Sequence, residues 1–156
     1  MPSPADLLKA AEEFCTSFAS GAPIDDVLSH FSTLHEPSAF EHGEPALAPF
    51  LGREFTGRVH VREYFELLAE LLSYEKMSFT NFIVDSDVHG VACRGSATFT
   101  WKATGQTWDE SFAYMLKFDE ACKVVDYQVW ADSGAAYLAR IGKLDEVRNG
   151  GNQVQE

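Results

Sequence analysis

Residues 107–118 read TWDESFAYMLKF and alternate between two kinds of side chain. The even positions, Trp108 to Phe118, are large and apolar apart from Glu110 and Tyr114, whereas the odd positions are mostly small or polar. Because successive side chains of a β-strand point to opposite faces, this pattern predicts a strand with one buried face and one solvent face. Glu110 is the only acid on the predicted buried face.

The segments on either side alternate in the same way. Residues 77–85, 88–103 and 123–132 also read as strands, separated by short connections rich in turn-forming residues. Such short connections predict antiparallel neighbours. In 88–103 the odd positions are expected to face inward, which leaves Arg94 on the convex side. The small Gly95 on the inward face would make room for a ligand or for a helix.

The first half of the chain has a helical period. Ser3 and Asp6 are typical of a helix start, and Gly21 is typical of its end. Residues 23–31 read as a short second helix. Residues 59–72, VHVREYFELLAELL, place their apolar side chains on one stripe and form the strongest helix pattern in the sequence.

The remaining segments complete the expected architecture. A first strand is expected over 33–42, interrupted by Pro37, and a last short helix over 135–144. Residues 1–145 are expected to form a single domain and residues 146–156 a flexible tail. This order of elements predicts an α+β fold in which a curved antiparallel sheet wraps over helices.

Composition narrows the class of partner. The chain has 156 residues, which suits one core, and 13% of them are aromatic. The formal net charge is −12, and the basic residues are scattered rather than clustered. Such a field repels phosphate backbones and anionic lipids, so we expect no nucleic-acid partner and no membrane partner.

Cysteine usage and the N-terminus point to a reducing compartment. Cys15, Cys93 and Cys122 are widely spaced and form no pair typical of zinc binding, so no metal is expected. The first residues, MPSPADLL, lack the pattern of a signal peptide. We therefore expect a cytoplasmic protein with reduced thiols.

Three stretches carry a family resemblance: GREFTGRVHVREYF (52–65), FTWKATGQTWDESFAYMLKFD (99–119) and KVVDYQVWADSGAAYL (123–138). They resemble SnoaL-like proteins of the nuclear transport factor 2-like superfamily, including fungal members from natural-product pathways. The resemblance implies a cone-shaped sheet with an open-ended internal pocket. Relatives include ketosteroid isomerase, scytalone dehydratase, limonene epoxide hydrolase and polyketide cyclases, but also binding modules, so this fold does not fix a function.

The resemblance places a polar residue from the end of the first strand at the pocket mouth, and the matching pair is Glu41-His42. Phe40 and His42 share one strand face, and Glu41 lies on the other. Because Phe40 is the larger apolar anchor, we expect its face to point inward, which places His42 at the pocket and Glu41 outside. Histidine can move protons near neutral pH without help. A surface histidine near a turn is the alternative.

Two acids are further catalytic candidates. Burial of Glu110 would raise its pKa and suit it to acid–base work, unless it is a rim carboxylate paired with Arg94. The resemblance implies a working aspartate on the last strand, where Asp132 matches, or Asp126 in another register. Asp132 could instead cap the last helix. Tyr114 would stabilise an enolate oxygen by hydrogen bonding.

Aromatic residues on the inward faces are expected to contact a substrate. This predicted lining set is Phe40, Tyr64, Trp101, Trp108, Phe112 and Tyr127. Tyr64 could also donate a hydrogen bond to a substrate carbonyl, or belong to the core.

These candidates support two hypotheses about function. The first is an enzyme of natural-product metabolism that isomerises, cyclises or dehydrates an apolar polyketide- or terpenoid-like substrate by acid–base chemistry without a cofactor. The second is a non-catalytic ligand-binding or scaffold protein. In both cases the resemblance, together with the convex sheet face that carries Trp130, predicts a homodimer through that face. An Asp–Arg–Asp epoxide-hydrolase arrangement is a third possibility, and it requires Arg94 to face inward.

Overall fold

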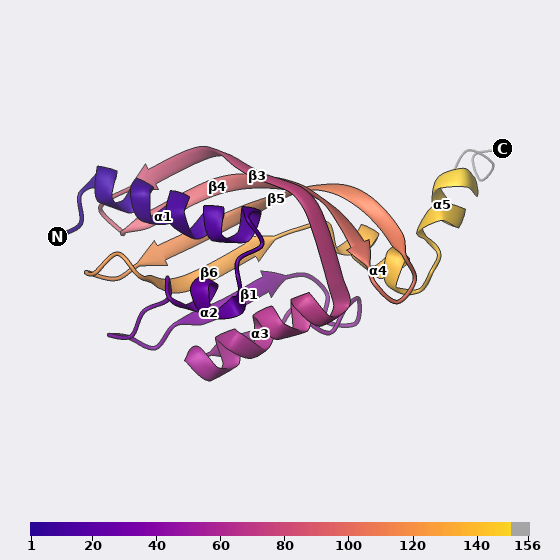
Figure 1. Cartoon of the computed structure of the whole chain (residues 1–156), viewed down its shortest axis with the longest axis horizontal. Coiled ribbons are helices and arrows are strands. Elements are labelled where there is room, and N and C mark those ends of the chain that lie inside the picture. Colours follow the sequence, from indigo (N-terminus) through magenta and orange to yellow (C-terminus); the bar gives the residue numbers. More distant parts are fainter. Residues whose placement is uncertain (151–156) are drawn as a thin grey trace.

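The computed structural model describes residues 1–150 (Figure 1). Four long strands follow the central helix, as the sequence predicts, and a short strand precedes it that the sequence did not reveal. The elements are α1 (Pro4–Ala19), α2 (Ile24–Leu28), β1 (Ser38–His42), β2 (Glu54–Thr56), α3 (Arg58–Leu71), β3 (Leu72–Asp85), β4 (Gly90–Trp101), β5 (Gln106–Phe118), β6 (Val124–Trp130), α4 (Ser133–Arg140) and α5 (Leu144–Gly150).

One open, mixed sheet organises the molecule. Its strand order is β2-β1-β6-β5-β4-β3, and the β3 to β6 neighbours are antiparallel as predicted. The prediction of a purely antiparallel sheet is wrong at one position, because β1 pairs with β6 in parallel. Between these two neighbours the chain passes through β2, α3 and the three antiparallel strands β3, β4 and β5.

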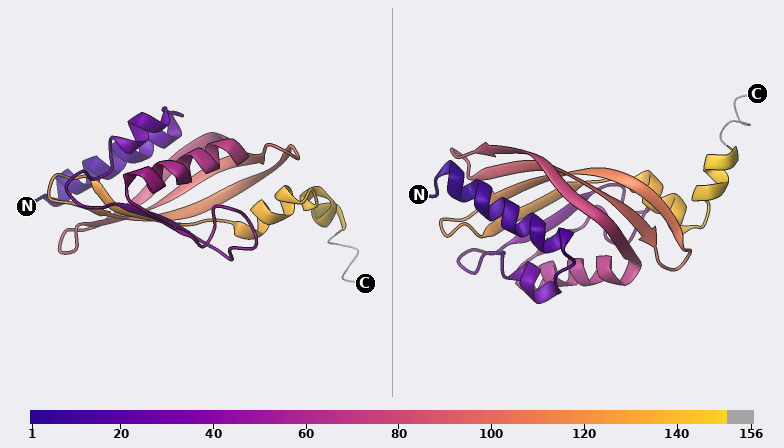
Figure 2. Two further views of the ribbon diagram at one scale, coloured as in Figure 1. Left: turned by 90° about the horizontal axis from the view of Figure 1, so that it is seen from below. Right: turned by 45° about the horizontal axis from the view of Figure 1, so that its top comes forward.

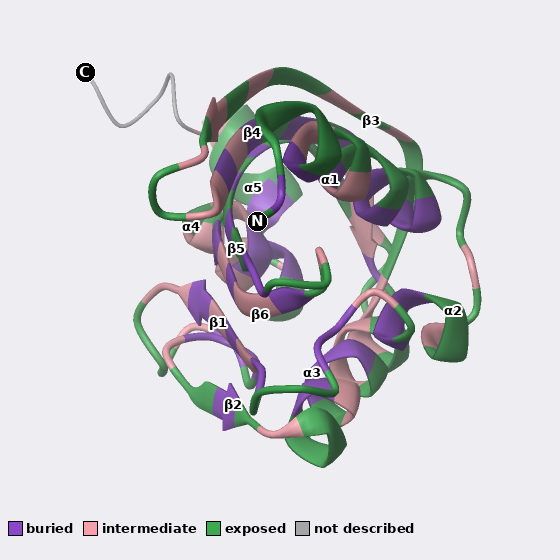
Figure 3. Ribbon diagram, turned by 90° about the vertical axis from the view of Figure 1, so that its left-hand side faces the viewer, coloured by how far each residue is buried: buried purple, intermediate pink, exposed green. Residues whose placement is uncertain are grey.

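Helices cover the concave face of this sheet. Figures 1 and 2 show α1, α2 and α3 on one side of the strands, with α4 and α5 beyond one end. The start of α1 is capped as predicted, because the Ser3 side chain accepts from the Asp6 N–H and the Asp6 side chain accepts from the Ser3 N–H. Figure 3 shows buried residues on α1 and α3 and along β4, β5 and β6, the elements that supply most of the core.

Strand β3, at one edge of the sheet, is irregular at two places along its length. Its pairing with β4 shifts between Glu75 and Ser78 and again between Thr80 and Ile83. Lys76 and Asn81 have positive φ at these two places. Bulges of this kind increase the twist and bend of a strand, so they help the sheet to curve over the helices.

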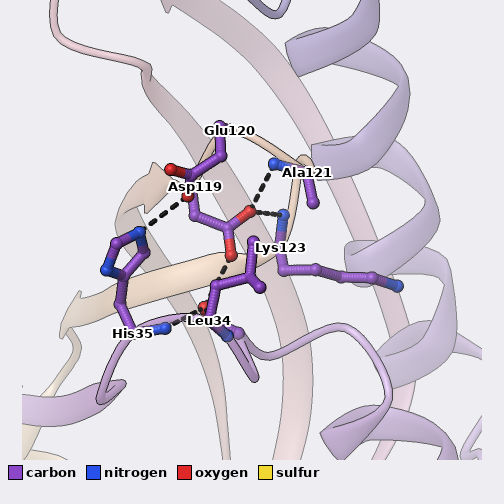
Figure 4. A network of polar contacts seen from close by, with 7 residues as sticks. Leu34, His35, Asp119, Glu120, Ala121 and Lys123 are labelled. Atoms are coloured by element: carbon purple, nitrogen blue, oxygen red, sulfur yellow. Dashed lines mark hydrogen bonds and ion pairs between the residues drawn. The ribbon is translucent and has the colours of Figure 1, made fainter.

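Figure 4 shows how the β5–β6 turn is fixed to the loop after α2. Asp119 accepts from the Ser32 hydroxyl at 2.6 Å and from the backbone N–H groups of Ala121 and Lys123. These hydrogen bonds lower the pKa of Asp119, against its own desolvation. His35 contacts Glu120 at 2.7 Å in an exposed position. The network fixes one end of the sheet and lies outside the cavity described below.

The C-terminal segment differs from its predicted boundaries. Helix α4 ends at Arg140, and α5 covers Leu144–Gly150, which the sequence assigned mainly to the tail. The Gln106 side-chain oxygen accepts from the Leu144 N–H and fixes the start of α5. The rest of the predicted tail, 151–156, lies outside the described residues. Among residues 1–150, no helix combines the length and apolarity that a membrane crossing requires.

Gly95 has a packing role that differs from both expected ones. The Phe112 ring from β5 lies directly over it, and a Cβ at this position would be only 2.3 Å from a ring carbon. Neither a ligand nor a helix therefore takes the space above Gly95. Both partners stand on the concave face, as the alternation predicts.

Replacing Gly95 with Ala should destabilise the fold, because the added methyl group must displace the Phe112 ring. We expect the free energy of unfolding to fall by about 1–3 kcal/mol, as for other overpacked cores. Urea unfolding measures the change. The matched control is Gly134→Ala, where an added Cβ meets nothing closer than 3.7 Å. Equal effects of the two variants would contradict this packing.

Candidate functional site

A cavity of about 160 Å³ lies on the concave face of the sheet. Strands β1, β5 and β6, helix α3 and the N-cap of α4 contribute most of its polar groups. The apolar side near the helices includes Phe18, Ile24, Leu68, Leu72, Tyr74 and Met77. An engineered cavity of about 150 Å³ holds a benzene ring, so this space suits a compact ring system.

Glu41 is the most buried acid in the cavity wall, with 7% of its surface exposed. The Tyr64 hydroxyl, projecting from α3, donates to its Oε1 at 2.6 Å. Desolvation, partly opposed by this hydrogen bond and reinforced by the charge of Glu110, raises the pKa of Glu41 to about 8. Glu41 is therefore mostly protonated at pH 7.

Three buried tyrosines stand beside Glu41. Tyr64 and Tyr127 have ring centroids 5.7 Å apart, and Tyr127 and Tyr114 have centroids 5.0 Å apart. Burial raises the pKa of each phenol well above its usual value. All three line the cavity as neutral hydroxyls at neutral pH. They can donate hydrogen bonds without carrying charge.

Glu110 is the second buried acid of the wall, as predicted from strand alternation. Trp108, two residues earlier on β5, donates its indole N–H to Oε1 of Glu110 at 2.9 Å. Desolvation raises the pKa of Glu110, while hydrogen bonds from Trp108 and from the backbone of Asp132 oppose that rise. These donors favour the ionised form, so the two acids have different surroundings.

Asp132 caps the last helix, which was one of its two expected roles, and it also lies at the cavity, where the other role would place it. Its Oδ1 accepts from the Ala135 N–H at 3.0 Å and caps α4. It also lies at the exposed rim of the cavity. Its charge acts on Glu110, whose pKa it raises.

The predicted orientation of β1 is wrong. Ala39 and Glu41 face inward, beside Tyr127 and Val129 of β6, whereas Phe40 and His42 face outward. Neither Phe40 nor His42 lines the cavity.

Aromatic packing on the convex face of the sheet explains why the predicted orientation of β1 is wrong. The His42 ring stacks on Trp130 with centroids 4.0 Å apart, and its Nε2 lies 2.8 Å from the Gln128 side-chain oxygen. Phe40 packs against His42 on the same face. Phe40 therefore belongs to an aromatic cluster with His42 and Trp130 on the convex side. Its apolar character alone predicts the wrong face of β1.

Most of the other expected site residues line the cavity, whereas Trp101 and Arg94 do not. The cavity brings together Tyr64, Trp108, Glu110, Phe112, Tyr114, Tyr127 and Asp132. Trp101 is buried but outside the cavity, where its ring stacks with Phe50. Arg94 is exposed and donates to the Asn81 side chain, so the epoxide-hydrolase arrangement is contradicted. Within residues 1–150, no three His, Cys, Asp or Glu side chains are grouped as metal ligands would be.

No protein-family model and no curated protein matches the sequence. Solved structures match over most of their length. A nuclear transport factor 2-like protein of Burkholderia xenovorans is 17% identical, with 89% of this chain and 98% of that chain covered and a TM-score of 0.69. The BvnE pinacolase of Penicillium brevicompactum is 17% identical, with 92% and 96% covered and a TM-score of 0.64.

A third match is TerC co-crystallised with polyporic acid, at 15% identity, with 88% and 98% covered and a TM-score of 0.71. At these identities the likeness is one of fold. The chain has the α+β cone of nuclear transport factor 2-like proteins, as the sequence resemblance implied.

The protonated Glu41 should appear in the pH dependence of stability. Its pKa is near 4.5 when unfolded and about 8 when folded, so its contribution is complete below pH 4.5 and is lost as the pH rises through 8. Relative to Glu41→Gln, we expect the wild-type free energy of unfolding to fall by on the order of 1.4 kcal/mol per pH unit in that window. Urea unfolding at pH 5 and pH 9 measures the difference.

Asp109 supplies the control, because it is exposed on the face of β5 opposite to Glu110. There it accepts a hydrogen bond from the Thr98 hydroxyl of β4. Asp109→Asn should show no such trend relative to wild type. A difference between wild type and Glu41→Gln that stays constant with pH would contradict a neutral Glu41.

Proposed function

We propose that the protein is a small-molecule enzyme that moves protons on an apolar carbonyl substrate by acid–base catalysis without a cofactor. One observation carries this proposal: Glu41 and Glu110 are both buried in the wall of one largely apolar cavity. Paired acids whose surroundings push their pKa values apart are typical of acid–base sites. The isomerase, cyclase and dehydratase classes all use such proton shifts.

Glu41 is the proposed acid. Its raised pKa keeps a proton available at neutral pH, and its hydrogen bond from Tyr64 engages Oε1 and leaves Oε2 for a ligand. A neutral carboxyl can donate to a substrate carbonyl oxygen and stabilise the enolate that forms there. Tyr64 then stabilises the carboxylate that Glu41 becomes when it gives up its proton. A pKa near the operating pH makes such transfer effective in both directions.

Glu110 is the proposed base. The Trp108 indole and the Asp132 backbone favour its ionised form, and its carboxyl lies in the same cavity as Glu41. It would take the proton from the carbon next to the carbonyl while Glu41 supplies a hydrogen bond to the oxygen. Returning the proton to another carbon completes an isomerisation. Delivering it instead to a hydroxyl group on the neighbouring carbon breaks that C–O bond, and water leaves to give a dehydration.

Solved structures of the same fold lend support of a coarser kind. One is named a pinacolase, and another was crystallised with the small molecule polyporic acid. These names support a small-molecule substrate, and the size of the cavity suits one built on a compact ring system, such as a polyketide- or terpenoid-like molecule.

Proton exchange tests the proposal without knowledge of the natural substrate. Incubation of 1-tetralone or 1-indanone with the protein in D₂O, followed by ¹H NMR, measures exchange at the carbon next to the carbonyl. We expect exchange faster than in buffer, and a loss on the order of 100-fold or more in Glu110→Gln and in Glu41→Gln, as for removal of a general acid or base.

The matched controls are His42→Ala and Asp109→Asn, which change outward-facing side chains near the two acids. Both should exchange within about threefold of wild type. No exchange above buffer across such ketones, or loss in His42→Ala but not in Glu41→Gln, would contradict this assignment.

The pH profile of this exchange should be bell-shaped. Glu110 must be ionised and Glu41 protonated, so the rate should rise with pH through the pKa of Glu110, which lies above 4.5, and fall above about pH 8. Glu41→Gln should remove the alkaline fall from whatever rate remains. A rate that keeps rising beyond pH 9 in wild type would contradict an acid role for Glu41.

A ligand carrier is the second candidate function, because most of the cavity wall is apolar and well suited to binding alone. Tight binding of ring ketones with no proton exchange in any of them would favour the carrier.

We further infer a homodimer through the convex sheet face, where Met115 and Trp130 are 54% and 40% exposed. A Met115→Glu, Trp130→Glu double variant should sediment as a monomer if the wild type sediments as a dimer.

A further inference from the structure

The charge of the cavity wall narrows the class of ligand. Among the described residues that line the cavity, the ionisable groups other than phenols are the three acids Glu41, Glu110 and Asp132, and there is no Lys, Arg or His. Lys102, which donates to the Ala69 carbonyl on α3, contacts a lining residue but is not itself part of the wall.

We propose that this cavity selects uncharged ketones and alcohols and rejects carboxylates and phosphates of the same shape. The inference rests on the proposed function for the placement of the substrate carbonyl, and it deepens that function by naming the charge class of the substrate. It concerns binding, so it can be tested where no reaction is followed.

Desolvation gives the first reason. An anion that enters an apolar cavity loses its hydration, and the loss is tolerated only when a cation or several donors replace the water. Here the nearby charges have the same sign as the ligand, so they repel it. The net charge of −12 adds a repulsive field outside the cavity.

Donors give the second reason. The Glu41 carboxyl and the hydroxyl of Tyr127 or Tyr114 can each serve a neutral oxygen at the polar end. A neutral carbonyl needs only one or two such hydrogen bonds, whereas a carboxylate needs charge compensation that this wall lacks. An acid could still enter in its protonated form, but at pH 7 an acid with a pKa near 4 is about one part in a thousand neutral. This fraction sets the scale of the expected discrimination.

The test uses three naphthalene derivatives of similar size and different charge. Equilibrium dialysis at pH 7 measures the Kd of 2-acetylnaphthalene, 2-naphthoate and 2-naphthylmethylammonium for the intact protein. We expect the ketone to bind on the order of 100- to 1,000-fold more tightly than the naphthoate. The ammonium should bind no more tightly than the ketone, because the loss of its hydration offsets its attraction to Glu110 and Asp132.

Substitutions test whether the charge of the cavity wall, rather than the size of the ligand, sets the ratio of the two affinities. Glu110→Gln should bring the naphthoate and ketone affinities closer by about tenfold or more, because one wall carboxylate is removed. Asp109→Asn removes the same charge from the opposite face of β5 and should leave the ratio unchanged. Leu72→Lys, at the junction of α3 and β3, should strengthen naphthoate binding relative to the ketone.

Naphthoate affinity within threefold of the ketone, a preference for the ammonium of tenfold or more, or failure of all three to bind would overturn the inference. An equal effect of Glu110→Gln and Asp109→Asn on the ratio would also overturn it. Failure here is distinguishable from failure of the proposed enzyme. Charge discrimination without proton exchange contradicts only the enzyme, and exchange without discrimination contradicts only the ligand class.

Discussion

The hydrogen bond from the Tyr64 hydroxyl to Oε1 of Glu41 joins the central helix to the first strand inside the cone. It places a carboxyl where water is scarce and gives it one donor instead of a cation. Desolvation raises the pKa of Glu41, and the Tyr64 hydrogen bond only partly opposes that rise. The neutral state of Glu41 and its proposed acid function both depend on this one arrangement.

The rest of the fold holds these two residues in place. Pairing of β1 with β6 fixes Glu41 beside Val129 and turns its side chain toward the concave face. The bent β3 lets the sheet curl over the helices, and the Phe112 ring over Gly95 fills the floor next to Glu110. Because packing in the core is dense, the remaining space is small, and it is lined by the two acids and the neutral tyrosines.

Much of this was predictable from alternation and helical period. The concave faces of β4 and β5, the capped start of α1 and the burial of Glu110 and Tyr114 all follow from local patterns. The orientation of β1 did not, since five residues with aromatic or polar side chains on both faces carry no clear period. Its face is set by a parallel partner more than 80 residues away in sequence, Ala39 lying opposite Tyr127. A long-range pairing of that kind has no local signal, so Glu41 was assigned to the wrong side and His42 to the cavity.

The most direct test of the account is the ionisation of Glu41 itself. A ¹³C NMR titration of the glutamate side-chain carboxyl carbons, with the Glu41 signal assigned by its absence in Glu41→Gln, reports that equilibrium in the intact protein. The account predicts a midpoint near 8 for this signal. A midpoint near 4.5, the value of an ordinary glutamate, would contradict the neutral, buried acid on which the proposed chemistry and the proposed ligand class depend.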